Sequence, residues 1–199
     1  MAPSIKLVYF DREARAEIIR ICFAFGKVPF EDKRISKEEF AAMKPTLPLE
    51  QVPVLHVDGF IYSQTMAMVR YASALSGIYP MEAPHVLKVE SILGCYDELG
   101  MHIVQILHFI PDEAAKAAKT KELVEHTCPK VLGYVQNLIS GKFVLDGKFS
   151  IADVAIFSIV DHYLFAMKGF NVSKYPKILS VVENVKAEPN IAAYLSKKV

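Results

Sequence analysis

The stretch KLVYFDREARAEIIR, residues 6–20, joins two kinds of sequence. Its first residues belong to a short apolar run, 5–10, whose β-branched and aromatic residues are typical of a buried strand. Apolar residues then recur at helical spacing: Ala16, Ile19, Cys22 and Phe23. Gly26 supplies a helix stop. The stretch therefore predicts a strand followed by a helix, with Tyr9 near the strand's end.

The next segments predict more strands beside the first. KVPFEDKRI, 27–35, is typical of a second strand, and a crossover between parallel strands is almost always right-handed. The dipeptide Asp58-Gly59 favours a two-residue hairpin between strands at 54–57 and 60–62. These four strands predict a mixed four-stranded sheet.

The rest of the chain is dominated by helical patterns. A helix is expected from 64 to 74, after which Gly77, Pro80 and Pro84 interrupt the pattern. The segments 85–110 and 113–139 are long enough for helices of several turns, and Pro111 separates them. Further helices are expected within 147–167, which is apolar on nearly all sides, and within 175–195. In the first of these, Ser150 followed three residues later by Asp153 resembles a capping box with Asp in place of Glu or Gln. We therefore predict an α/β domain, a linker and an all-α domain, at residues 1–76, 77–83 and 84–199.

Composition excludes several classes of function. The chain has 199 residues, and 23 Lys and Arg balance 22 Asp and Glu, so we expect no nucleic-acid partner. Apolar runs are too short to cross a membrane, and the N-terminus lacks a secretory signal, which predicts a cytoplasmic protein. The three cysteines are widely separated and the histidines lack ligand spacing, so reduced thiols and no metal site are expected.

Three features carry candidate chemistry. Tyr9 ends a strand, where side chains reach the crevice beyond α/β strands, although tyrosine is also a common packing residue there. Pro53 follows Val52 at a strand entrance; if that bond is cis, the Val52 backbone faces outward and can pair with an extended peptide. Gln64 and Thr65 open a helix, whose N-terminus either binds a carboxylate or is simply capped.

Together these features fit a small peptide with carboxylates at its ends. Lys44 and Arg15 would add positive charge to the same site, or could equally be solvated surface charges. The motifs KLVYFDREARAEIIR, EQVPVL, SQTMAMVRY and FSIADVAIF resemble, in order and spacing, those of cytosolic glutathione transferases of the tyrosine type, particularly the sigma-like branch. The resemblance runs through essentially the whole chain.

This resemblance implies a thioredoxin-like glutathione-binding domain followed by an all-α domain. Tyr9 matches the catalytic tyrosine that donates a hydrogen bond to the sulfur of glutathione, and Arg15 matches an arginine that supports it. Asp97 matches an acid that reaches glutathione from the partner subunit of a homodimer. The other matching glutathione-binding positions are Phe40, Lys44, Gln51, Val52, Pro53, Gln64 and Thr65.

Two departures from the family pattern affect the site. A glycine usual in the family is Ala14 here, which reduces backbone freedom, and a common tryptophan is Phe40, which removes an NH donor. Both are expected to weaken glutathione binding. No cysteine occurs at 9–15, so thiol–disulfide exchange at this corner is not expected.

The predicted function is conjugation of the glutathione thiolate to small apolar electrophiles, as in detoxification. The electrophile pocket is expected between the domains, near Phe10, Met101, Val104 and Gln105. Two alternatives remain open: a glutathione-dependent isomerase similar to prostaglandin D synthase, and a non-catalytic ligand-binding or crystallin-like protein.

Overall fold

The computed structural model describes residues 3–165 and 167–198. Its sheet has the order β2-β1-β3-β4, with β1 and β2 parallel and the other neighbours antiparallel. The mixed four-stranded sheet predicted from the sequence is confirmed. The strands are β1 (Ile5–Phe10), β2 (Glu31–Ile35), β3 (Val54–Val57) and β4 (Phe60–Tyr62).

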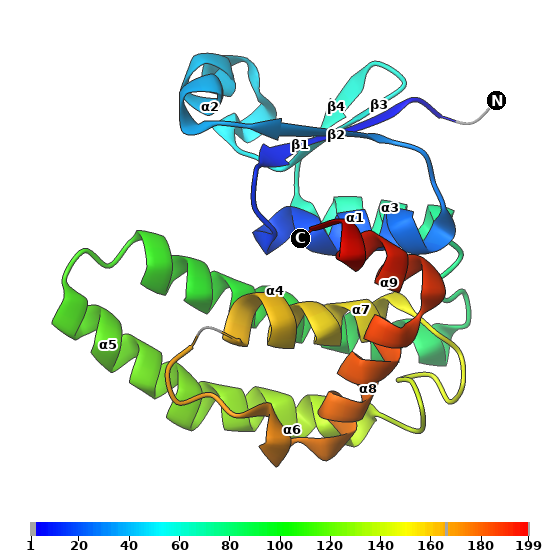
Figure 1. The fold of residues 1–199 in the computed structure, drawn as a ribbon, viewed down its shortest axis with the longest axis vertical. Helices are drawn as coiled ribbons and strands as arrows, with labels where there is room; N and C mark the ends of the chain where they lie inside the picture. The colour runs from blue at the N-terminus through cyan, green and yellow to red at the C-terminus, as the bar shows by residue number, and fades with distance from the viewer. Residues whose placement is uncertain (1–2, 166, 199) are drawn as a thin grey trace.

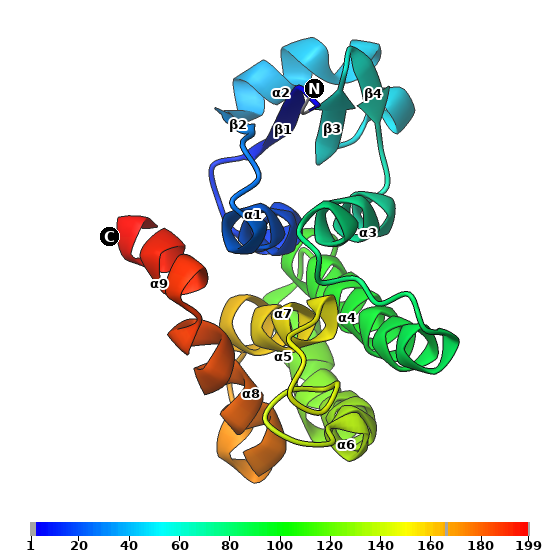
Figure 2. The same cartoon turned by 90° about the vertical axis from the view of Figure 1, so that its right-hand side faces the viewer.

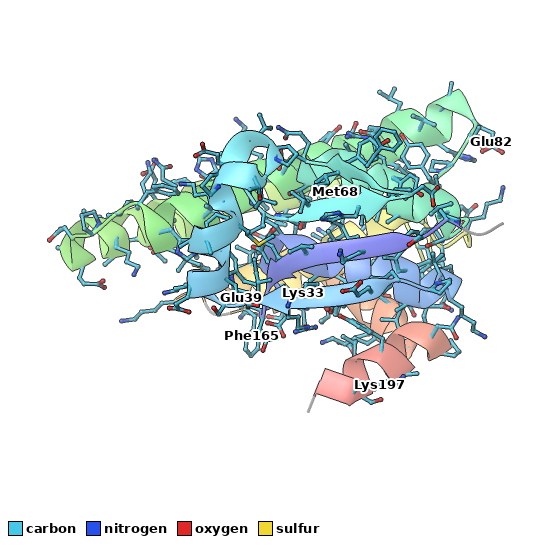
Figure 3. All side chains as sticks on the ribbon, turned by 90° about the horizontal axis from the view of Figure 1, so that it is seen from above. Lys33, Glu39, Met68, Glu82, Phe165 and Lys197 are labelled. Atoms are coloured by element: carbon cyan, nitrogen blue, oxygen red, sulfur yellow. The ribbon has the colours of Figure 1, made fainter. Side chains whose placement is uncertain are left out.

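Helices cover both faces of this sheet (Figure 2). Helices α1 (Ala14–Gly26) and α3 (Thr65–Leu75) lie between the sheet and the rest of the molecule, while α2 (Lys37–Met43) lies on the opposite face. The short helix α2 was not predicted. An ion pair of 3.3 Å between Lys33 on β2 and Glu39 on α2 helps to hold it there (Figure 3).

Alternate side chains of β1 belong to different cores. Ile5, Leu7 and Tyr9 pack in the large core that includes α1 and α3, whereas Val8 packs in a small cluster beneath α2. This alternation follows from the two-residue period of a strand. Tyr9 is therefore directed toward the helical half of the protein.

The second half of the chain is helical and packs against α1 and α3 (Figure 1). Its central helix is α7, in which every residue is buried. Two π-helical segments, Leu123–Thr127 and Ile159–Leu164, continue α5 and α7. The helices are α4 (Ala83–His108), α5 (Glu113–Glu122), α6 (Cys128–Leu138), α7 (Ile151–Ser158), α8 (Pro176–Ala187) and α9 (Pro189–Leu195). Within the described residues, no helix is both long and apolar enough to span a membrane.

A buried carboxylate fixes the start of α7. One oxygen of Asp153 accepts hydrogen bonds from the amide and hydroxyl of Ser150, at 2.8 and 2.9 Å, and the other accepts from the Val144 amide at 2.8 Å. This is the capping box expected from the sequence, with Asp in place of Glu or Gln. Burial raises the pKa of the Asp153 carboxyl to about 6.

The two halves are joined through the segment between α3 and α4. Ile78 is 4% exposed, and its amide donates to the Ser73 carbonyl at 3.0 Å. The Ile78 carbonyl accepts from the Ile151 amide at the start of α7, also at 3.0 Å. This segment is therefore part of the packed interior at the junction of the two halves.

A buried arginine connects α1 to neighbouring elements. The Arg20 side chain is fully buried and donates to Asp32 at 3.0 Å, to Glu17 at 3.3 Å and to the Arg12 carbonyl at 2.8 Å. The Tyr194 hydroxyl on α9 donates to Glu17 at 3.0 Å. Arg20 thus supports the loop that follows Tyr9.

Candidate functional site

A cleft of about 1790 Å³ lies between the end of β1 and the helical half. Helices α4 and α5 and the π-helical segment Ile159–Leu164 form much of its far wall. Nine residues predicted for the site line it: Tyr9, Phe10, Arg15, Phe40, Lys44, Gln51, Val52, Met101 and Val104. Chain segments far apart in the sequence therefore converge on one cleft.

Tyr9, at the end of β1, is one of the residues that line this cleft. It is 3% exposed, and its ring contacts the Phe10 ring edge-on, with centroids 5.5 Å apart. The Arg12 guanidinium carbon lies 6.0 Å from the centre of the Tyr9 ring and 5.3 Å from that of Phe10. Packing holds the tyrosine in place within the lining of the cleft.

The first turn of α1 contributes Arg15 to the lining of the cleft. Its Nη2 lies 3.0 Å from the sulfur of Met101 on α4. A thioether is a weak acceptor, so this contact leaves the guanidinium's donor capacity largely available to a ligand. Ala14, just before it, has φ 38°, in the region that favours glycine. The structure thus places Ala14 in a conformation where the glycine usual in the family would be unstrained.

Helix α2 and the segment before β3 form one side of the cleft. Phe40 contacts Phe10 edge-on, with ring centroids 5.3 Å apart. The Lys44 ammonium lies 4.0 Å from a Glu50 carboxylate oxygen, and the two side chains are 48% and 65% exposed. Gln51 and Val52 follow, and the Val52–Pro53 peptide bond is cis, the isomer considered from the sequence.

Gln64 and Thr65 begin α3 but lie outside the lining of the cleft. Gln64 has φ 75° and ψ 103°, an uncommon backbone conformation for a residue other than glycine. Its carbonyl accepts from Ala67 and Met68, and no side chain caps the helix within the described residues. The start of α3 therefore offers amide donors without a capping side chain.

The predicted residues on α4 separate into two groups. Met101 and Val104 line the cleft, whereas Gln105 is exposed and lies outside its lining. Asp97 is exposed on the same helix and also lies outside the cleft.

Other lining residues were missed by sequence reasoning. Tyr163, on the π-helical segment, lies in the cleft wall, and so does Arg12 in the loop after β1. The helical half also contributes lysines, among them Lys116 and Lys121 on α5. Nothing in the spacing of these residues indicated that they face Tyr9's cleft. Among the described residues, no three His, Cys, Asp or Glu side chains are grouped so as to hold a metal ion.

Family comparisons agree with this architecture. The family model "Glutathione S-transferase, N-terminal domain" matches residues 3–74, which include the sheet. The model "Glutathione S-transferase, C-terminal domain" matches residues 98–198. The combination of a sheet domain with a helical domain is thus shared with this family.

Individual relatives align over nearly the whole chain. A glutathione S-transferase of Anopheles gambiae is 31% identical over 199 residues, covering 98% of this chain and 97% of that protein. The structure of prostaglandin synthase D of Nilaparvata lugens is 28% identical with a TM-score of 0.89, covering 98% of each chain. That of a Fasciola hepatica sigma class GST is 27% identical with a TM-score of 0.87, covering 100% of this chain and 98% of that one. The chain belongs to the glutathione S-transferase family.

Proposed function

We propose that this protein conjugates the thiolate of glutathione to apolar electrophiles. The observation that carries the proposal is the position of Tyr9, which is buried at the end of β1 and belongs to the lining of the cleft. Apolar side chains from both halves share that cleft, including Phe10, Val104 and Ile106. An apolar electrophile would therefore lie beside a thiol bound near Tyr9.

Tyr9 acts as a hydrogen-bond donor to the sulfur of glutathione. A free thiol has a pKa near 8.5, so most of it is protonated at neutral pH. Lowering that pKa by about 2 units requires about 2.7 kcal/mol, which is reasonable for a hydrogen bond to an anion in a dry pocket. Arg15, in the next turn, adds positive charge near the same point. Binding both reactants side by side supplies the rest of the rate acceleration, because it removes the entropic cost of bringing them together.

The remaining residues of the proposed site hold the two ends of glutathione. Lys44 and Gln51, with Phe40 as an apolar wall, bind the glycine end. The backbone of Val52, before cis-Pro53, pairs with the cysteine residue of the peptide. Gln64 and Thr65, at the uncapped start of α3, bind the γ-glutamyl carboxylate.

We also propose that the active form is a cytoplasmic homodimer in which Asp97 of one subunit reaches the γ-glutamyl amine in the other. Large apolar side chains that are exposed in the single chain support an interface with a second copy: Phe60, Tyr62, Met81 and Leu87. Mixing inactive Tyr9→Phe and Asp97→Asn variants tests the arrangement. A heterodimer has one site with both residues intact, so activity should recover on mixing. Failure to recover, with dimers confirmed by light scattering, would show that Asp97 does not act across subunits.

The Tyr9→Phe variant tests the central role. Titration of bound glutathione, followed by the ultraviolet absorbance of the thiolate, should give a pKa about 2 units below 8.5 for the parent. In Tyr9→Phe that shift should largely disappear, and conjugation of a general aryl halide should fall accordingly. Equal titration curves for the parent, the variant and free glutathione would refute the proposal.

Names of relatives favour two further candidates. The similar structure of a prostaglandin synthase D, and a relative named hematopoietic prostaglandin D synthase in Mus musculus, favour a glutathione-dependent isomerase in the same cleft. A relative named S-crystallin SL11 in Nototodarus sloanii favours a non-catalytic protein. Turnover of a prostaglandin endoperoxide without net consumption of glutathione would indicate isomerisation. Tight glutathione binding without conjugation or isomerisation would indicate the non-catalytic form.

A further inference from the structure

Two tyrosines that are 67 residues apart in the sequence meet at the wall of the cleft. Tyr96 lies on α4, and Tyr163 lies on the π-helical segment Ile159–Leu164. Their hydroxyl oxygens are 2.9 Å apart, and their rings stack with centroids separated by 5.3 Å. Tyr96 is 2% exposed and Tyr163 6%, and of the two, Tyr163 lines the cleft.

The burial of Tyr96 fixes the direction of the hydrogen bond. Either hydroxyl can be the donor by distance alone. If Tyr163 donated, however, the Tyr96 proton would be enclosed without an acceptor among the described residues, at the full cost of its desolvation. We therefore assign Tyr96 as the donor. The Tyr163 oxygen accepts this bond and keeps its own proton for a group in the cleft.

Gly100 on α4 lets the ring and hydroxyl of Tyr163 pack closely against that helix. A Cβ added at Gly100 would lie 3.1 Å from the Tyr163 ring and 3.5 Å from its hydroxyl oxygen, so glycine allows this close approach. The next residue, Met101, contacts Arg15 at 3.0 Å. Electrostatic effects of Tyr9 and Arg15 reach both phenols of the pair. Burial raises the pKa of Tyr163 to about 12, so its proton is present at neutral pH.

We propose that Tyr163 is a second hydrogen-bond donor in the active site, directed at an oxygen of the electrophile, and that Tyr96 positions its proton. The inference rests on the proposed conjugation. It selects electrophiles whose reaction leaves negative charge on oxygen, such as aryl epoxides. The thiolate sulfur bonds to an epoxide carbon while the carbon–oxygen bond breaks and its electron pair stays on oxygen. The Tyr163 hydroxyl stabilises this alkoxide, which then takes a proton from water.

A matched pair of substrates separates this role from a structural one. Styrene oxide and benzyl chloride both present a phenyl ring, but benzyl chloride expels chloride and develops no charge on oxygen. In Tyr163→Phe, kcat/KM for styrene oxide should fall about a hundredfold, as on loss of one oxyanion donor, with benzyl chloride changed less than about twofold. The titration of bound glutathione should stay as in the parent. In Tyr96→Phe the loss should be smaller, about tenfold, and again confined to styrene oxide.

Three results for the Tyr163→Phe variant would overturn the assignment: equal losses with both substrates, an unchanged styrene oxide rate, and a shift of the thiolate titration. If circular dichroism shows that Tyr163→Phe is unfolded, the Tyr96→Phe/Tyr163→Phe double variant is used instead. The double variant leaves no buried phenol without an acceptor. A parent that conjugates benzyl chloride but not styrene oxide refutes only the role of Tyr163. A parent that conjugates neither refutes the proposed conjugation as well.

Discussion

The Asp153→Asn substitution tests the electrostatics of the capping box that starts α7. The carboxyl accepts hydrogen bonds from the Ser150 amide, the Ser150 hydroxyl and the Val144 amide. Asparagine has one acceptor oxygen, so it cannot satisfy all three donors and should destabilise the fold by about 1–3 kcal/mol. The more specific expectation concerns how the difference between parent and variant changes with pH.

In the folded state, burial raises the pKa of Asp153 from 3.8 to about 6, despite three hydrogen bonds that favour the anion. A carboxyl with a raised folded pKa contributes stability when it is protonated in the folded state, and that contribution is lost as pH rises through about 6. A shift of about 2 units corresponds to about 3 kcal/mol at full effect, of which about 2 kcal/mol should be lost between pH 4 and pH 7. The Ser150 hydroxyl can accept as well as donate, so the protonated carboxyl keeps a partner.

Urea denaturation of parent and Asp153→Asn at pH 4, 5, 6 and 7 measures this effect. The variant lacks the titrating group, so subtracting its free energy of unfolding removes the contribution of all other titrating residues. The parent's advantage should shrink by about 2 kcal/mol from pH 4 to pH 7. A constant difference across this range would mean that the three donors offset the desolvation of the carboxylate. If the parent's stability advantage over Asp153→Asn grew with pH, the pKa of Asp153 would be lowered in the folded state, and the prediction would be refuted.

Three further substitutions have defined outcomes. Ala14→Gly should raise the free energy of unfolding by about 0.5–1 kcal/mol, because φ 38° strains alanine more than glycine costs in chain entropy, and a lower value in urea denaturation would contradict this. Glu50→Gln frees Lys44 from its 4.0 Å ion pair, so KM for glutathione should fall about two- to fivefold at low salt, with the difference vanishing at high salt. Arg20→Met removes a charge partner of buried Glu17 and should cost about 3–5 kcal/mol of stability. The control Arg34→Met, at a 37% exposed partner of Asp32, should cost much less in the same assay.

Local sequence signals predicted much of the fold. The hairpin is the clearest case, since Asp58 and Gly59 both adopt positive φ between β3 and β4, as their dipeptide indicated. The capping box at Ser150 also follows from side chains three residues apart. Both depend on neighbours along the chain, which is why the pattern alone reveals them.

Features that depend on distant contacts or weak patterns were missed. Helix α2 has only 7 residues, and none of them is buried. Its sequence therefore lacks the periodic apolar positions that indicate a helix. That capping box, between Ser36 and Glu39, was the available signal. The partnership of Tyr96 and Tyr163 arises from the packing of α4 against the end of α7, and no local pattern encodes it. The cross-subunit role of Asp97 stays a prediction.

The backbone hydrogen bonds of Ile78, between α3 and α4, bear on how the cleft accommodates ligands of different sizes. The Ile78 amide bonds to Ser73 and its carbonyl to Ile151, so these bonds connect α3 to α7. They oppose a hinge motion that would move the two halves apart and widen the cleft. Adjustment therefore falls to unbranched, polarisable side chains on the walls, of which Met101 and Met167 are two. Ligands of different shapes would then be accommodated by rotamer changes of these wall side chains, while the width of the cleft stays constant.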